Sequence, residues 1–120
     1  MPTILIVDDE PTILTLAAMA LGRQYRVLTA PSGPEGLEVL AGERIDLLLT
    51  DHRMPDMTGA EMLRTARLDH PGLPCILSTG YTEAGELKAA MDEGNVRLLF
   101  KPWSPTELRQ AVAEALETER

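Results

Sequence analysis

The stretch LLLTDHRMP, residues 47–55, joins an apolar run to an acid. The run has the composition of a buried strand, which we place at residues 45–50, and Asp51 follows it directly. A carboxylate at the edge of a core costs desolvation free energy unless other groups compensate for it. The sequence therefore predicts that Asp51 belongs to a site whose compensating groups come from elsewhere in the chain.

Short apolar runs alternate with helix-like segments along the whole chain. The period of the apolar residues predicts strands at 3–7, 25–30, 45–50, 74–79 and 96–100. It predicts helices at 11–22, 37–42, 60–68, 85–94 and 105–117. Three S/T-x-x-E patterns, typical of helix starts, begin at Ser32, Thr58 and Ser104. This alternation predicts an α/β fold in which a single doubly wound parallel sheet carries five helices, in one domain over residues 1–120.

The overall charge, the first apolar run and the single cysteine exclude several classes of protein. Nineteen acidic against eleven basic residues give a net charge of −8, which disfavours direct binding to nucleic acid. The first apolar run is interrupted at Asp8, too soon for a signal peptide or a membrane span. Cys75 is the single cysteine and cannot form an internal disulfide. We therefore expect a cytoplasmic protein that has no membrane partner.

Polar side chains stand where the predicted strands end. Because ligands bind at the carboxyl edge of a doubly wound sheet, these groups should gather there. Clustered carboxylates call for a cation, and hard oxygen ligands suit Mg²⁺. Asp51 could then remain ionised and act as a nucleophile towards phosphorus, with Lys101 neutralising charge. The strand-end residues are Asp8 and Asp9, then Asp51, then Thr79 and Gly80, then Lys101 and Pro102.

Four blocks in order, ILIVDDE, DLLLTDHRMPDMTG, STGY and KPW, resemble the receiver domain of bacterial two-component response regulators. The resemblance covers essentially the whole chain. It implies a flavodoxin-like sheet with strand order 2-1-3-4-5. It also implies that Asp51 accepts a phosphoryl group from a histidine kinase or a histidine phosphotransfer protein, and that the chain signals to a downstream effector. Such a domain catalyses only its own phosphotransfer and dephosphorylation.

The same resemblance implies roles for single residues. Asp8, Asp9, Asp51 and the main-chain carbonyl of Arg53 would hold Mg²⁺, or Mn²⁺ in its place. Around the phosphoryl group, Thr79 would supply a moving hydroxyl, Gly80 an amide and Lys101 an ammonium. The bond from Lys101 to Pro102 would be cis, and Pro55 and Gly59 match the family's loop after the acceptor. The switched surface would comprise the fourth helix, fifth strand and fifth helix, near residues 83–118, and could support a homodimer.

One residue departs from the usual receiver pattern, and two residues at variable positions could modulate the lifetime of the phosphorylated state. Leu98 stands where receivers often carry Tyr or Phe, so we expect reduced or different switching. Arg53 and Tyr81 are bulky residues close to the acceptor, and we expect them to shield the acyl phosphate and slow its hydrolysis. Arg53 also occupies the position where a phosphohydrolase would ordinarily carry its general acid.

Several alternatives stay open at this point. Asp9 could cap the first helix instead of binding metal. Ser78 could be the site hydroxyl in place of Thr79. The whole chain could be an interaction module that needs no phosphorylation, or a receiver cut from a larger hybrid kinase or regulator. Away from these positions, His52 and His70 are expected to be solvated, and Trp103 to pack beside the last helix.

Overall fold

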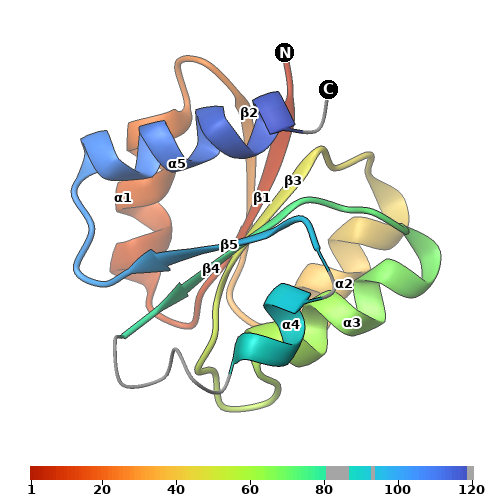
Figure 1. The fold of residues 1–120 in the computed structure, drawn as a ribbon. Helices are drawn as coiled ribbons and strands as arrows, with labels where there is room; N and C mark the ends of the chain where they lie inside the picture. The colour runs from red at the N-terminus through yellow and green to blue at the C-terminus, as the bar shows by residue number, and fades with distance from the viewer. Residues whose placement is uncertain (81–86, 93, 119–120) are drawn as a thin grey trace.

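Five parallel strands form one sheet with helices on both of its faces (Figure 1). The computed structural model describes residues 1–80, 87–92 and 94–118. The strand order is β2-β1-β3-β4-β5, which confirms the expected topology. The strands are β1 Thr3–Val7, β2 Arg26–Ala30, β3 Leu47–Asp51, β4 Cys75–Thr79 and β5 Val96–Phe100. The helices are α1 Pro11–Leu21, α2 Gly33–Gly42, α3 Gly59–Asp69, α4 Lys88–Asp92 and α5 Pro105–Thr118.

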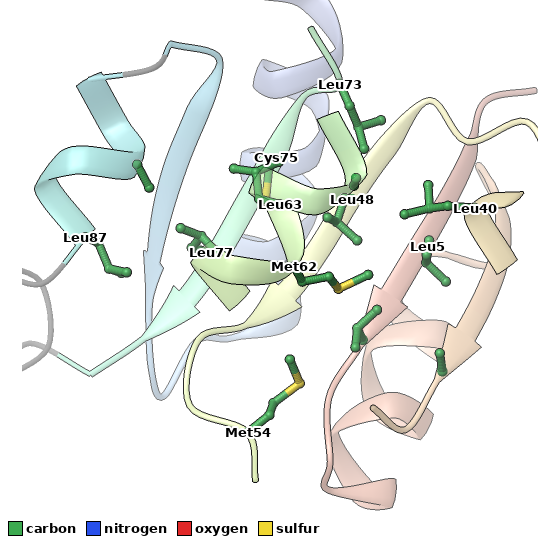
Figure 2. Close-up of a cluster of buried hydrophobic side chains, with 14 residues drawn as sticks. Leu5, Leu40, Leu48, Met54, Met62, Leu63, Leu73, Cys75, Leu77 and Leu87 are labelled. Carbon is green, nitrogen blue, oxygen red and sulfur yellow. The ribbon is translucent and has the colours of Figure 1, made fainter. Parts of the chain in front are cut away.

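The sheet separates two hydrophobic clusters. Helices α1 and α5 cover one face, and α2, α3 and α4 cover the other (Figure 1). Successive residues of β1 alternate between the clusters: Ile4 and Ile6 pack towards α1 and α5, and Leu5 and Val7 pack towards α2 and α3. Figure 2 shows the cluster on the α2, α3 and α4 face, with Met62 between Leu77 on one side and Leu5 on the other.

The three central strands β1, β3 and β4 are buried along their whole length. Their sequences are nearly unbroken apolar runs because helices cover both faces of a parallel sheet, so side chains on both sides of each strand are buried. Strand β3 begins two residues later than predicted and includes Asp51 as its last residue. Helix α2 begins at Gly33, earlier than the predicted residue 37. The predicted helix 85–94 overlaps α4, but residues 85, 86 and 93 lie outside the described part of the chain.

Side-chain caps begin three of the helices. Thr58 and Glu61 form a reciprocal capping box at α3. Ser104 and Glu107 do the same at α5, where the Glu107 amide donates to Ser104 Oγ at 3.1 Å and the Ser104 amide donates to Glu107 Oε1 at 3.0 Å. At α2 the Ser32 hydroxyl accepts from the helix backbone. All three sequence patterns therefore mark real helix starts. None of the helices in the described residues is both long enough and apolar enough to cross a membrane.

Candidate functional site

Three carboxylates meet at the carboxyl edge of the sheet. Asp8 directly follows β1, and Asp51 ends the neighbouring strand β3, where Val7 and Thr50 are register partners. Asp8 and Asp51 retain only 2% and 7% of their accessible surface, whereas Asp9 is exposed. One carboxylate oxygen from each of Asp8, Asp9 and Asp51 lies within 4.8 Å of the others. The fold thus brings together the acids that the sequence placed at two separate strand ends.

Lys101 supplies a positive charge to this cluster. Its Nζ atom lies 3.2 Å from Asp51 Oδ1 and 3.5 Å from Asp8 Oδ2. Lys101 follows β5, so its side chain reaches past the end of β4 to contact residues of β3 and β1. Its main-chain amide donates to the Thr79 carbonyl at 2.9 Å, which holds the start of the loop against β4. The structure therefore places the Lys101 ammonium beside Asp51, whereas its expected pairing with a phosphoryl group stays a prediction.

The electrostatics of the cluster leave its negative charge only partly compensated. Burial raises the pKa of Asp8, although the Glu10 amide at 2.9 Å and Lys101 oppose the shift. Burial and the nearby Asp8 carboxylate raise the pKa of Asp51, again against the effect of Lys101. Burial alone would lower the pKa of Lys101, but the Asp51 and Asp8 carboxylates overcome it and raise the pKa. Ionising either aspartate therefore costs more free energy than ionising a free carboxyl group, and a further cation would offset this cost.

The donor set fits a hard divalent cation. Carboxylate oxygens close together, two of them buried and one open to solvent, are the ligands that Mg²⁺ uses when it keeps several waters. Asp9 does not cap the first helix, because the N-cap position of α1 is occupied by Glu10. The side chain of Glu10 makes no capping hydrogen bond. The alternative role for Asp9 is thus wrong, and its carboxylate belongs to the acidic cluster. Arg53 lies two residues beyond Asp51 in the following loop, with an exposed side chain.

The end of β4 carries two hydroxyls with different surroundings. Ser78 is the register partner of Asp51, and its Oγ accepts a hydrogen bond from Trp103 Nε1 at 3.1 Å. Thr79 is the last residue of the strand, is 1% exposed and donates from Oγ1 to the Gly80 carbonyl at 3.3 Å. Ser78 is therefore engaged with the loop after β5. Thr79 and Gly80 stand one step closer to the carboxyl edge, which favours Thr79 as the site hydroxyl.

The loop after Asp51 turns back tightly on the strand. The His52 amide donates to the Ser78 carbonyl at 3.0 Å, and the His52 carbonyl accepts from the Gly59 amide at 2.8 Å. A Cβ atom at Gly59 would lie 2.6 Å from the Asp51 carbonyl oxygen, so only glycine fits this approach. Pro55 lies in this loop and is exposed, whereas the side chain of Met54, in the same loop, is buried in the hydrophobic cluster (Figure 2).

One of the two histidine expectations is wrong. His52 is 5% exposed, and the prediction that it is solvated is wrong. The reason is the tight return of the loop, which places the residue after the strand back against β4 instead of in solvent. His70 follows the last residue of α3 as its C-cap and is half-buried, with its amide donating to the Ala66 carbonyl at 2.9 Å. Hydropathy alone could not reveal either position.

The remaining predicted residues are placed as follows. The Lys101–Pro102 peptide bond is cis, as expected, and Pro102 itself is exposed. Leu98 is half-buried and packs against the cluster that contains α4 residues, so it is part of that core. Tyr81, which is predicted to shield the acyl phosphate, lies outside the described residues.

Sequence reasoning missed one contact at the site. Trp103 packs against the cluster under α1 and α5, as predicted, but its indole also donates the hydrogen bond to buried Ser78. The only signal in the sequence is a residue with an N–H donor two positions after Lys101. That signal does not identify its acceptor, which comes from another strand.

Comparison with known proteins gives a consistent result. A family model described as "Response regulator receiver domain" matches residues 4–113. The chain is 38% identical over 115 residues to transcriptional regulatory protein GlrR of Escherichia coli, covering 95% of this chain and 26% of that protein. It is 35% identical over 122 residues to a probable cyclic di-GMP phosphodiesterase of Vibrio cholerae, covering 98% of this chain and 27% of that protein. The chain thus spans about a quarter of the length of these relatives.

A solved structure with the same fold covers nearly the whole chain. It is the response regulator receiver domain protein from Clostridium thermocellum, with a TM-score of 0.91 and 33% sequence identity. The match covers 99% of this chain and 97% of that chain. Both the sequence and the arrangement of its elements therefore relate the chain to the same group of proteins.

Proposed function

Because the chain belongs to the family of response regulator receiver domains, we propose that it is a phosphoacceptor signalling domain with Asp51 as the acceptor. The observation that carries the proposal is the position of Asp51. It is buried at the carboxyl edge of the sheet, 3.2 Å from the Lys101 ammonium and beside the carboxylates of Asp8 and Asp9. A carboxylate held next to a cation and a metal-ligand set is suited to attack phosphorus.

The proposed reaction is a single transfer. A carboxylate oxygen of Asp51 attacks phosphorus as the bond from phosphorus to the donor's imidazole nitrogen breaks, and the electron pair of that bond stays on the nitrogen. The product is an acyl phosphate on Asp51. Mg²⁺, or Mn²⁺, bound by Asp8, Asp9, Asp51 and the Arg53 carbonyl would neutralise charge on the phosphoryl oxygens.

Other residues of the chain bind the transferred group in this proposal. Lys101 donates from Nζ to a phosphoryl oxygen while remaining beside Asp51. The Gly80 amide donates to a second oxygen. Thr79 gives up its bond to the Gly80 carbonyl, 3.3 Å long here, and turns its hydroxyl proton towards the phosphoryl group. This exchange of acceptors is the first movement by which the domain would respond.

The response shifts an equilibrium between two conformations of the domain. We place the changing surface on α4, β5 and α5, of which residues 87–92 and 94–118 are described. Leu98 packs in the core beside α4, so repacking there takes the place of an aromatic rotation. The same surface is proposed to contact a downstream effector and to support a homodimer.

The proposed partners follow from the chemistry and from the relatives. The phosphodonor is a histidine kinase or a histidine phosphotransfer protein. One relative is named as a transcriptional regulator and another as a probable cyclic di-GMP phosphodiesterase, each about four times the length of the matched part. An effector of either class, joined to the receiver or separate from it, is therefore proposed. Exposed Arg53, with Tyr81, is proposed to slow hydrolysis of the acyl phosphate.

The test is a mass measurement on the intact protein. After incubation with Mg²⁺ and acetyl phosphate, we expect the wild type to gain one phosphoryl group. Asp51→Asn should gain none, and neither should the wild type in the presence of a chelator. Asp56→Asn, which replaces an exposed acid of the same loop, should gain the group as the wild type does.

A second candidate function is a binding module that needs no phosphorylation. The observation in its favour is Leu98, a core aliphatic residue where an aromatic gate is usual in the family. A wild type that binds Mg²⁺ and is folded, yet gains no phosphoryl group, would contradict the first proposal and support this one.

A further inference from the structure

The loop that carries Lys101 is attached to β4 by a side-chain hydrogen bond. Trp103 Nε1 donates to Ser78 Oγ at 3.1 Å, and Ser78 is 4% exposed. Trp103 is the only tryptophan in the sequence. A phenylalanine at this position would pack in a similar way but would carry no donor. The contact is therefore a feature of this chain's tryptophan, beyond the burial of an aromatic ring.

The acceptor of this bond stands next to the proposed phosphoacceptor. Ser78 is the register partner of Asp51, and its carbonyl accepts from the His52 amide at 3.0 Å. On the other side of β4, the Lys101 amide donates to the Thr79 carbonyl at 2.9 Å. Ser78 thus connects to the Asp51 strand through its main chain and to the Lys101 loop through its hydroxyl.

We propose that Trp103 is a positioning residue for phosphotransfer, acting through Lys101. This inference rests on the proposed function. The Lys101 side chain is half-buried and reaches past β4 to Asp51, and its loop is attached to β4 by one main-chain bond at Lys101 and one side-chain bond at Trp103. The hydrogen bond from Trp103 to Ser78 fixes the direction in which the loop leaves β5. It thereby holds Nζ at 3.2 Å from Asp51 Oδ1.

The test compares variants of the two partners of the bond. Trp103→Phe removes the donor and keeps a ring, and Ser78→Ala removes the acceptor and keeps the tryptophan. At saturating Mg²⁺ and acetyl phosphate, each should lower the phosphorylation rate constant about threefold to tenfold, the equivalent of one neutral hydrogen bond. The Mg²⁺ affinity, measured by calorimetry, should stay within about twofold, because the proposed ligands lie on other segments.

Two further variants separate positioning from simple stability. Ser104→Ala removes the cap of α5 from the same loop, so it should lower the melting temperature while leaving the rate constant unchanged. In a Lys101→Ala background, Trp103→Phe should cause no additional loss of rate, since its effect passes through Lys101. Equal losses of rate in Ser104→Ala and Trp103→Phe would overturn the inference, as would an additive loss in the double variant.

A structural readout decides the inference independently of phosphotransfer. In a crystal structure of Trp103→Phe, we expect Lys101 Nζ to lie beyond hydrogen-bond distance from Asp51. An unchanged separation of 3.2 Å would overturn the inference even if the wild type is phosphorylated. A wild type that gains no phosphoryl group contradicts the proposed function instead, and the Lys101 position in the variant then still decides whether Trp103 holds it.

Discussion

The Lys101 ammonium lies 3.2 Å from Asp51 Oδ1, although strand β4 lies between β3, which ends in Asp51, and β5, which Lys101 follows. The contact exists because the carboxyl ends of β3, β4 and β5 share one edge and the lysine side chain is long enough to pass the middle strand. It places a fixed positive charge where the proposed phosphotransfer would develop negative charge.

Replacing Asp51 with Asn should raise the free energy of unfolding near neutral pH when no metal is present. Burial and the Asp8 carboxylate raise the pKa of Asp51 in the folded state above its usual value of 3.8. The carboxyl group therefore contributes most to stability below about pH 3.8, and this contribution is lost as the pH rises through the folded pKa. The gain in Asp51→Asn should therefore be larger at about pH 7 than at about pH 3.5.

Melting curves with a chelator, at both pH values, measure this difference. A gain on the order of 1 kcal/mol corresponds to about 4 °C for a domain of this size. Asp92→Asn makes the same chemical change on the exposed surface of α4 and should shift neither curve. A less stable Asp51→Asn at neutral pH would show that the Lys101 ion pair outweighs burial.

Mg²⁺ should stabilise the protein through Asp9 as well as through the buried acids. A ligand present at about a hundred times its dissociation constant adds about 2.7 kcal/mol to the free energy of unfolding. Asp9 is exposed, so Asp9→Asn should change the metal-free melting temperature little while removing most of the Mg²⁺-dependent rise. The adjacent variant Glu10→Gln is the control, with NaCl at equal ionic strength. An undiminished rise in Asp9→Asn would remove Asp9 from the ligand set.

Alanine should have opposite effects at two glycines. At Gly59 a Cβ atom would lie 2.6 Å from the Asp51 carbonyl oxygen, and we expect a loss of about 1 to 3 kcal/mol as the loop moves. At Gly42, in the last position of α2, a Cβ atom meets nothing within 4 Å, and alanine should stabilise by up to about 1 kcal/mol. Urea unfolding measures both. A neutral Gly59→Ala would mean that the loop after Asp51 adapts without strain.

Cys75 should be unreactive until the protein unfolds. Burial raises the pKa of its thiol from the usual 9.0 to about 12, so the thiolate is disfavoured in the folded protein. The buried thiol of Cys75 contributes fully to stability below about pH 9.0, and this contribution is lost as the pH rises through the folded pKa of about 12. Labelling with an aromatic disulfide at mildly alkaline pH should follow the unfolding transition in urea, and Cys75→Ala should weaken the alkaline loss of stability. Rapid labelling of the native protein would contradict this.

Some features of the site could be predicted because they depend on neighbours in the sequence. The capping box at Thr58 uses a residue three positions away, and the acids that end β1 and β3 follow apolar runs directly. Other features depend on which segments the fold brings together. His52 is buried and Gly59 lies close to Asp51 because the loop after β3 folds back against the end of that strand. No local sequence pattern predicts this folding back.

The sequence by itself determined the alternation of strands and helices and, through that alternation, the edge of the sheet at which Asp8, Asp51 and Lys101 meet. Hydrophobic periodicity and helix-cap patterns involve residues only a few positions apart, so both can be identified from the amino-acid sequence alone. Only the tertiary structure decided that Trp103 bonds to Ser78. A side-chain hydrogen bond is set by the angstrom-scale placement of segments distant in sequence, and these two residues are 25 positions apart.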